Sequence, residues 1–423
     1  MNIAPLKDIL RFDILKPPVR QRLFLRPLTW LLSFPDVWMH HTKIHKSVSK
    51  DLKPPFLVLC NHVSFLDFKV LTAALFPKRA NYIVAIDGFV GPGREWLLRN
   101  AGGVCKRKFT NDVVLVRQLM RIIKNGDIAV IYPEARYSLC GTGAILPESL
   151  GKTAKLLKVP IVSLITKGHH IDSPVWNLRK RKVRTEADMK TIATAEEILT
   201  LSVNEINERI EKEFKYDDFA WQRENRVAVK QSWRAEGLHK VLYQCPNCKT
   251  EYRMSTSGAK IRCNQCGKIW IMSEYGELSA KEGVTEFSHI PDWYEWERSQ
   301  VAGEVENGTY GYDLTARVDS LPNARGFIPV GEASLKHNMD GFVLDGEHDG
   351  KPYHIEINAK TIYSLHIEYD YRGKGRDCID LNTHDDTFYI YPHGDEFAVT
   401  KMALATEEIY KKQRIESEIQ LSI

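Results

Sequence analysis

The chain has 423 residues, of which 43% are hydrophobic and 27% are charged, and its formal net charge is +5. A chain of this length and composition folds into two or three soluble domains, which excludes a disordered chain and a polytopic membrane protein. The small basic excess favours anionic substrates or lipid surfaces, but it is too small to indicate nucleic-acid binding by itself.

The N-terminal segment, residues 1–50, mixes arginines with bulky apolar side chains. Charged residues such as Lys7 and Asp8 interrupt any signal peptide. No apolar stretch of the chain approaches the ~20 residues that span a bilayer. We therefore expect an intracellular chain whose membrane contacts are peripheral. The stretch from Arg20 to Trp38 fits either amphipathic helices at a membrane surface or a hairpin packed on the protein's own core.

Residues 51–240 alternate short apolar runs with helical stretches, which predicts an α/β domain with a mostly parallel central sheet and flanking helices. The predicted strands are residues 56–60, 82–86, 128–132 and 161–165, and the clearest helices are residues 68–76 and 113–126. Polar residues gather just after these strands. Ligands of such sheets usually bind at the carboxyl ends of the strands, so these polar residues are candidates for a site.

The first polar segment, NHVSFLD, places Asp67 five positions after His62. If the strand ends near Cys60 and a helix begins near Ser64, the two side chains can face each other across the turn. A carboxylate that fixes the tautomer of an imidazole improves it as a general base, so the segment predicts a catalytic dyad that activates a substrate hydroxyl. The alternative is a capping turn followed by an unrelated aspartate, because an isolated H-x4-D is common by chance.

Three further segments follow predicted strands or glycines. Residues 101–109 place three consecutive cations after two glycines, which suits a phosphate, although such cations also commonly form a solvated surface. Residues 131–138 end a strand with a carboxylate and a guanidinium, which can pair with each other or hold a polar head group. The candidate substrate-binding residues are Lys106, Arg107, Lys108, Glu134 and Arg136. Residues 158–168 carry no acid or base before Lys167 and are interpreted as a wall of the site.

In this order and spacing, the four segments resemble the blocks of the glycerolipid acyltransferase family, the PlsC-like lysophosphatidic acid acyltransferases. NHVSFLD (61–67) matches the family's N-H-x4-D block without substitution. GGVCKR (102–107) resembles the second block, YPE (132–134) the third, which is usually F-P-E-G, and VPI (159–161) the fourth. The resemblance covers roughly residues 20–215, about half of the chain.

The resemblance implies transfer of a fatty acyl group from acyl-CoA or acyl carrier protein to the hydroxyl of a lysophospholipid, above all 1-acyl-glycerol-3-phosphate, which would give phosphatidic acid. His62 would be the general base and Asp67 its orienting partner. Arg107, with Lys106 or Lys108, would bind the acceptor phosphate, and Glu134 and Arg136 would complete that pocket. Because the thioester is already activated, the resemblance implies neither a catalytic metal nor a covalent enzyme intermediate. Ala135 stands where the family usually has glycine, and Arg136 lies one position early, so the head group stays open.

The resemblance also bears on location. The acceptor and product of such an enzyme lie in a bilayer, which favours the membrane-surface interpretation of the N-terminal segment and a cytoplasmic protein bound peripherally to the cytoplasmic membrane. A non-catalytic lipid-binding or regulatory protein that kept the acyltransferase fold is the alternative. The intact pair of His62 and Asp67 favours the enzyme, since a degenerate copy would be free to lose it.

Residues 241–275 contain two C-x2-C pairs, Cys245 with Cys248 and Cys263 with Cys266. Two such pairs at this spacing supply four thiolates for a tetrahedral Zn2+ and predict a structural zinc ribbon. Redox use of a C-x2-C pair and nucleic-acid binding are the alternatives. The basic residues around the cysteines are too sparse for us to expect nucleic acid.

Residues 300–423 change to alternating strands and turns that end in one helix. This pattern predicts a separate small β-rich domain of hairpins closed by a helix. By element order alone the region resembles a pleckstrin-homology-like barrel. Its histidines lack metal-ligand spacing and are expected to be surface or packed residues.

Overall fold

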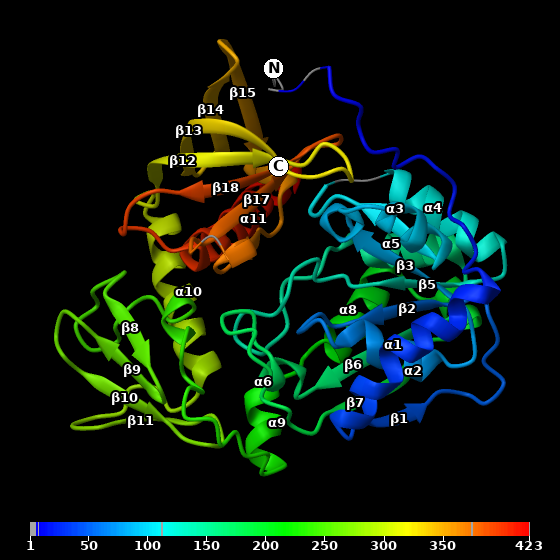
Figure 1. Ribbon diagram of the computed structural model, residues 1–423, viewed down its shortest axis with the longest axis horizontal. Helices are drawn as coiled ribbons and strands as arrows, with labels where there is room; N and C mark the ends of the chain where they lie inside the picture. Colours follow the sequence, from blue (N-terminus) through cyan, green and yellow to red (C-terminus); the bar gives the residue numbers. More distant parts are fainter. Residues whose placement is uncertain (1–5, 7, 111–112, 374, 423) are drawn as a thin grey trace. The chain divides into compact units, whose positions relative to one another are not determined.

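A computed structural model describes residues 6, 8–110, 113–373 and 375–422 of the chain (Figure 1). The described chain divides into two compact units. We call Asp13–Lys106 with Asp112–Val229 the α/β unit, and Met1–Phe12 with Arg107–Asn111 and Lys230–Ile423 the β-rich unit. Each unit is described by itself below.

The α/β unit is built on a mixed sheet with the strand order β1-β7-β6-β2-β5-β3-β4. These strands are β1 (Lys43–Ser47), β2 (Leu57–Cys60), β3 (Ala80–Ala85), β4 (Gly103–Lys106), β5 (Ile128–Ile131), β6 (Ile161–Lys167) and β7 (Glu186–Ala193). Neighbours pair in parallel except β6 and β7, which are antiparallel. The predicted α/β class with a mostly parallel sheet is therefore confirmed. The pattern of apolar runs missed β1, β4 and β7, of which β1 is a polar and mostly exposed edge strand.

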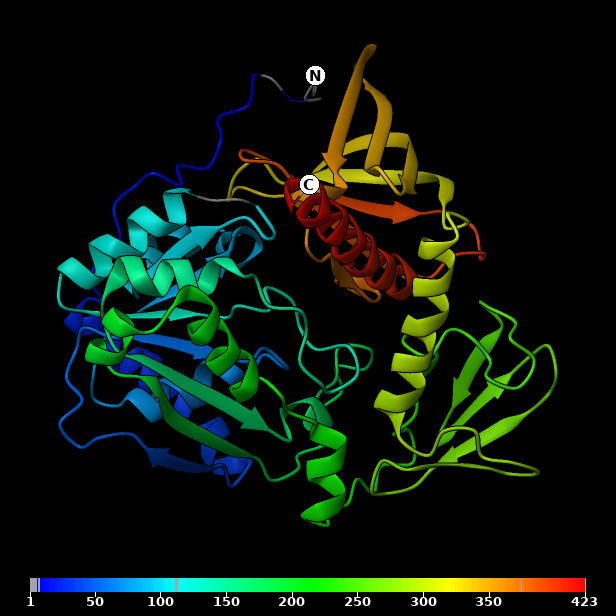
Figure 2. The ribbon, with the colours of Figure 1, turned by 180° about the vertical axis from the view of Figure 1, so that it is seen from behind.

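Helices cover both faces of this sheet (Figures 1 and 2). The helices of the unit are α1 (Arg26–Met39), α2 (Asp67–Leu75), α3 (Arg94–Asn100), α4 (Val113–Lys124), α5 (Ser149–Leu157), α6 (His169–Asp172), α7 (Ala195–Thr200), α8 (Val203–Glu213) and α9 (Asp218–Glu224), with short 3-10 turns η1 (Leu23–Leu25) and η2 (Ile86–Phe89). Apolar residues of α1 and α2 pack on one face, and those of α4, α5 and α8 pack on the other. The central strands β2 and β5 are buried along their whole length, which explains their continuous apolar sequences.

The described residues of the β-rich unit form two antiparallel sheets and two long helices. One sheet has four strands and the other has seven. The first sheet has the order β11-β10-β9-β8, and the second has the order β15-β14-β13-β12-β18-β17-β16. The elements are η3 (Leu238–Lys240), β8 (Met254–Ser257), β9 (Lys260–Cys263), β10 (Ile269–Met272), β11 (Leu278–Ala280), α10 (Ile290–Glu306), β12 (Tyr312–Ser320), β13 (Ile328–Asn338), β14 (Gly341–His348), β15 (Lys351–Asn358), η4 (Ala359–Thr361), β16 (His366–Glu368), η5 (Tyr371–Gly373), β17 (Cys378–Asn382), β18 (Thr387–Pro392) and α11 (Val399–Ser422). The predicted β-rich region ending in a helix is confirmed.

The apolar side of α11 is buried within the β-rich unit, where the helix packs against α10 and against the end of the large sheet (Figure 2). Met402, Leu404 and Ile409 on this side are almost completely buried. In the part of the chain that the structure describes, the helices are all too short or too polar to cross a lipid bilayer.

Candidate active site

The turn after β2 is fixed by Asn61, whose side chain continues the pairing of β2 with β6 beyond the last strand residue. Its Nδ2 donates to the carbonyl oxygen of Thr166 at 2.9 Å, and its Oδ1 accepts from the backbone N–H of Thr166 at 2.8 Å. Asn61 thus satisfies one donor and one acceptor that the end of a strand would otherwise leave unpaired. The chain that follows begins from a fixed position, which matters because His62 is the next residue.

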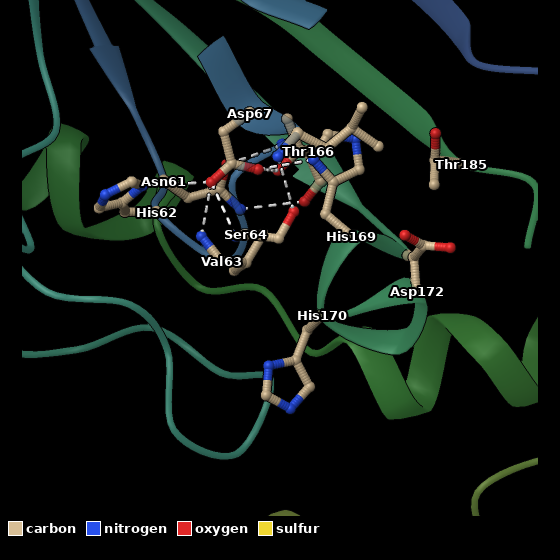
Figure 3. A network of polar contacts seen from close by, with 12 residues as sticks. Asn61, His62, Val63, Ser64, Asp67, Thr166, His169, His170, Asp172 and Thr185 are labelled. Atoms are coloured by element: carbon tan, nitrogen blue, oxygen red, sulfur yellow. Dashed lines mark hydrogen bonds and ion pairs between the residues drawn. The ribbon is translucent and has the colours of Figure 1, made fainter. Parts of the chain in front are cut away.

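Asp67, the first residue of α2, closes this turn with its carboxylate (Figure 3). Its Oδ2 accepts from the backbone N–H groups of Val63 and Ser64 at 2.7 and 3.0 Å and from Nδ1 of His62 at 3.2 Å. Burial alone would raise the pKa of Asp67, but hydrogen bonds from His169 and His62 outweigh it and lower that pKa to about 2. Asp67 is therefore an ionised acceptor at neutral pH, so Nδ1 of His62 carries hydrogen and Nε2 keeps its lone pair.

The imidazole of His62 contacts two tyrosine rings, and the His62 side chain is one quarter exposed. The ring centroids of Tyr132 and Tyr137 lie 4.6 and 4.1 Å from that of His62. The backbone N–H of Ser138 donates to the carbonyl oxygen of His62 at 2.8 Å. The loop after β5 therefore holds both the ring and the backbone of His62, while leaving part of the ring accessible.

Glu134, one of the candidate substrate-binding residues, holds the backbone of His62. Its Oε2 accepts from the His62 N–H at 2.7 Å, and its Oε1 accepts from the Ala144 N–H at 2.8 Å and the Tyr216 hydroxyl at 3.0 Å. The side chain is completely buried, and desolvation raises the pKa of Glu134 to about 7. Arg136 lies close enough to lower that pKa in part, and it is itself almost fully buried. Both residues thus lie in the immediate surroundings of His62.

Ala135 is the residue at which the sequence departs from the glycine of the acyltransferase block. Its backbone has φ of 54°, in the left-handed region where glycine is favoured, and its N–H donates to the carbonyl oxygen of Tyr132 at 3.1 Å. The tight turn therefore forms with alanine in the place of glycine. The departure changes the residue type without removing the turn that presents Glu134.

The three consecutive cations after β4 are divided between the two units. Lys106 ends β4 in the α/β unit, whereas Arg107 and Lys108 belong to the β-rich unit. The guanidinium of Arg107 donates there to the carbonyl oxygens of Leu321, Pro322 and Asp385 at 3.2, 3.1 and 2.8 Å and to the Thr387 hydroxyl at 2.7 Å. Lys108 donates to Asp380 at 3.0 Å. The structure therefore groups Glu134 and Arg136 with His62, and holds Arg107 and Lys108 by contacts within the β-rich unit.

A second histidine contacts Asp67, and sequence reasoning missed it. Nδ1 of His169, at the start of α6, lies 2.6 Å from Oδ1 of Asp67, and the Thr166 hydroxyl lies 3.3 Å from the same oxygen. Figure 3 shows His62 and His169 approaching Asp67 from different sides, while the neighbouring His170 points away. The signal in the sequence was KGHHID, in which a glycine and two histidines follow a buried strand. The sequence interpretation treats this strand as a wall of the site and ends the segment at residue 168.

The four cysteines of the C-x2-C pairs converge in the β-rich unit. Their Sγ atoms all lie within 4.8 Å of one another, with 3.8 Å between those of Cys245 and Cys266 and 3.7 Å between those of Cys248 and Cys263. A tetrahedron with metal–sulfur bonds of ~2.3 Å has edges of about 3.8 Å, so the spacing fits Zn2+. This group could hold a metal ion, as the spacing in the sequence predicted.

Residues 40–167 match the family model named Acyltransferase. No curated protein matches the chain. Among solved structures, the crystal structure of the 1-acyl-sn-glycerophosphate (LPA) acyltransferase PlsC from Thermotoga maritima is similar at 17% identity and a TM-score of 0.34, over 46% of this chain and 82% of that chain. The family match includes His62, Asp67 and Glu134 and ends two residues before His169.

Proposed function

We propose that the α/β unit transfers a fatty acyl group from an acyl thioester to the free hydroxyl of a lysophospholipid, with 1-acyl-glycerol-3-phosphate as the acceptor and phosphatidic acid as the product. The observation that carries this proposal is the accessible imidazole of His62, whose Nδ1 is committed to an ionised Asp67, inside the stretch that matches the acyltransferase model. The acceptor is the finer part of the proposal and rests on the family resemblance of the sequence.

The reaction needs one residue that transfers a proton and a second residue that stabilises the first while it is protonated. Nε2 of His62 takes the hydrogen of the acceptor hydroxyl as its oxygen forms a bond to the thioester carbonyl carbon. The carbon–sulfur bond of the tetrahedral intermediate then breaks, and the leaving thiolate takes the proton from Nε2. Asp67 stays ionised throughout, because its pKa is about 2, and it stabilises the imidazolium that forms between the two steps.

For the acceptor phosphate, we assign Arg136 as the principal cation. It is the residue of the predicted set that lies with Glu134 beside His62, and a guanidinium can bind two phosphate oxygens at once. Arg107 and Lys108 are not part of this proposal, because their side chains are engaged within the β-rich unit. Substitution of Arg136 by Met should raise KM for lysophosphatidic acid more than for an uncharged monoacylglycerol, whereas equal effects on both would remove this assignment.

The central test is acyl transfer to lysophosphatidic acid, with acyl-CoA and acyl carrier protein as separate donors. We expect activity in the unmodified protein and a loss of about 10²–10⁴-fold in the His62→Ala variant, because the general base is removed. The partly exposed His354, in the β-rich unit, offers a matched control, and His354→Ala should keep full activity. Activity that survives His62→Ala would reject the general base. Absence of transfer to every lysophospholipid tried would leave the non-catalytic lipid-binding protein as the better explanation.

We also propose that α1 lies on a membrane surface. Leu31, Leu32 and Trp38 on this helix expose 69, 57 and 69% of their area, a large apolar surface for one short helix. Trp30 and Phe34, in contrast, contact Phe76 after α2 at ring-centroid distances of 4.9 and 5.5 Å. One side of the helix is thus packed on the protein, and another side is exposed and available to a membrane surface.

The membrane proposal is tested with vesicles of anionic phospholipid. Replacement of Leu31, Leu32 and Trp38 by Ser should shift the protein from the vesicle pellet to the supernatant after sedimentation. The control replaces Leu178 and Leu199, which are equally exposed elsewhere in the α/β unit, and should leave the distribution unchanged. Equal binding by the two variants would contradict a role for α1.

For the cysteine cluster we propose a structural Zn2+ with four thiolate ligands, because four thiolates close the coordination shell. Purified protein should contain one zinc per chain by elemental analysis, and Cys248→Ser should lower the metal content and the melting temperature of the β-rich unit. Cys378→Ala, outside the cluster, should retain the metal. A full metal content in the Cys248→Ser variant would contradict the assignment.

A further inference from the structure

We propose that His169 is a positioning residue of the active site, which shares the Asp67 carboxylate with His62 and thereby sets how tightly His62 holds a proton. The inference rests on the proposed function of His62 as general base. It goes beyond that function because His169 lies outside the stretch that matches the acyltransferase model and is not expected from the sequence blocks. Its support is the contact geometry of one buried carboxylate with two imidazoles.

The two imidazoles contact different oxygens of Asp67 at different distances. His169 Nδ1 lies 2.6 Å from Oδ1, whereas His62 Nδ1 lies 3.2 Å from Oδ2. Oδ2 also accepts two backbone N–H groups, from Val63 and Ser64. The shortest hydrogen bond of the carboxylate is therefore made to the buried histidine. A short hydrogen bond to an ionised acceptor is a strong one, so His169 contributes heavily to the stabilisation of the Asp67 charge.

His169 cannot take the place of His62 as a base. Its side chain is completely buried, and its Nδ1 must donate because Asp67 is ionised. Its Nε2 is buried without a hydrogen-bond partner. Neither ring nitrogen is therefore open to a substrate hydroxyl. His169 thus acts on the reaction only through Asp67.

The backbone around His169 is fixed by a second buried carboxylate. Oδ1 of Asp218 accepts from the Gly168 N–H at 3.1 Å, and Oδ2 accepts from the His170 N–H at 2.9 Å, so the residues on both sides of His169 are held by one side chain. Gly168 has φ of 81°, and a Cβ there would lie 2.5 Å from the Trp221 ring. Only glycine fits this junction between β6 and α6. The local structure therefore gives His169 one position, aimed at Asp67.

The consequence for His62 follows from competition for the carboxylate. Each N–H that donates to Asp67 stabilises its negative charge and weakens its pull on the other donors. Without the His169 hydrogen bond, Asp67 would attract the Nδ1–H of His62 more strongly, and the imidazolium form of His62 would be stabilised. Removal of the His169 donor should therefore raise the pKa of His62, and the base form should appear only at higher pH.

Other titratable groups near the pair remain in place in such a variant. Around His62 they are Tyr132 and Tyr137, whose rings contact it, and Glu134 with Arg136 on the loop after β5. Around Asp67 they are Cys60 on β2 and Asp218 on α9, both close enough to interact electrostatically with its charge. A change confined to residue 169 thus isolates the contribution of its imidazole.

The test compares His169→Leu, which removes the donor, with His169→Asn, whose amide nitrogen can replace Nδ1. The first readout is the rate at which diethyl pyrocarbonate modifies His62, followed by mass spectrometry of the His62 peptide from pH 5 to 9. The reagent reacts with neutral imidazole, so the midpoint reports His62 directly and needs no catalysis. We expect the midpoint of His169→Leu to lie at least half a pH unit above that of the unmodified protein, and the midpoint of His169→Asn to return to it.

The second readout is the pH profile of acyl transfer. The acid limb of kcat/KM should move by the same amount in His169→Leu. For a shift of half a unit, kcat at pH 7 should fall by up to about threefold, with KM unchanged, because His169 does not touch the substrate. Thr166→Val removes the longer hydrogen bond to the same oxygen and should shift the limb less. A melting curve checks that each variant is folded, and if His169→Leu is not, His169→Phe replaces it.

An unchanged midpoint in the leucine or phenylalanine variant, or an equal shift in the asparagine variant, would overturn the role of His169. A loss of activity at all pH values without a shift of the midpoint would also overturn it, because it would indicate a purely structural effect. The proposed function fails separately, if the unmodified protein shows no acyl transfer or if His62→Ala keeps it. In that event the modification midpoints still decide whether His169 controls His62.

Discussion

Each unit of the molecule contains a histidine in contact with a buried aspartate, yet only one of the two pairs is suited to catalysis. In the α/β unit, His62 Nδ1 lies 3.2 Å from Asp67, and in the β-rich unit, His366 Nδ1 lies 2.9 Å from Asp380. Both carboxylates are buried, and the pKa of each is far below its usual value because hydrogen bonds and nearby positive charges outweigh desolvation. By distance alone, the second pair is the better dyad.

The difference lies in the other side of each ring. The His62 side chain is 25% exposed, whereas that of His366 is 4% exposed, and Nε2 of His366 lies 3.5 Å from Glu368. A substrate hydroxyl can reach the first ring and not the second. Asp380 also pairs with the Lys108 ammonium, and this pair stabilises the Asp380 charge in the folded state. A histidine and an aspartate at the right distance thus mark a catalytic pair only when the distal ring nitrogen is accessible.

The sharpest test of this comparison replaces each aspartate by asparagine. Asp67→Asn should lower acyl transfer by about 10³–10⁴-fold, because an amide neither stabilises the imidazolium nor enforces the Nδ1–H tautomer. Asp380→Asn should leave activity within twofold of the unmodified protein but lower the free energy of unfolding, because Lys108 loses its counter-charge. The measurements are kcat/KM and urea unfolding of both variants. Comparable losses of activity in the two would refute the distinction.

A second prediction concerns Lys108, which the sequence assigned to the acceptor phosphate. Lys108→Met leaves the buried Asp380 charge with fewer partners and should lower the free energy of unfolding by about 3 kcal/mol at pH 8. KM for lysophosphatidic acid should not change. Lys336, in an exposed pair with Asp313, is the control, and Lys336→Met should stay within about 0.5 kcal/mol. A stable variant with a raised KM would restore the phosphate role of Lys108.

A third prediction extends the comparison to a buried carboxylate without a histidine donor. Asp218 accepts only backbone N–H groups in the contacts described above, and desolvation raises its pKa to about 7. The folded state then keeps its proton at pH values where the unfolded state has lost it, so stability falls as pH rises between about 4 and 7. Asp67, with a pKa of about 2, has the opposite effect and loses its contribution as pH falls through that value.

Urea unfolding from pH 5 to 8 measures the Asp218 effect. The unmodified protein should lose about 2 kcal/mol more stability over this range than Asp218→Asn, because the amide does not titrate. Parallel stability curves for the two proteins would contradict the raised pKa of Asp218.

The sequence predicted the parts of the molecule that depend on local pattern. The strands 128–132 and 161–165 are nearly the observed β5 and β6, because central strands of a parallel sheet are apolar throughout. The pair of His62 and Asp67 could be predicted because it is closed within one turn of chain. The cysteine cluster could be predicted because two short turns hold all four thiols.

Contacts between distant segments could not be predicted. Arg107 follows a strand and two glycines, as a phosphate-binding residue would, and nothing in its neighbours indicates that its guanidinium contacts residues more than 200 positions later. His169 was missed for the same reason, since its partner Asp67 lies 102 positions earlier. Local sequence shows that a residue is charged or titratable. Which group it meets depends on the packing of the whole unit.

The attachment of Arg107 to the β-rich unit has a consequence for the order in which the chain acquires structure during synthesis. Thr387, one of its acceptors, lies 280 residues further along the chain. At ~5–20 residues per second, a ribosome needs about 14–56 seconds to make that interval. During this time the residues around β4 have already been synthesised, whereas the Arg107 guanidinium has only water and transient partners. The segment after β4 is therefore among the last parts of the first 110 residues to reach its final contacts, and a chain released early would keep that cation exposed.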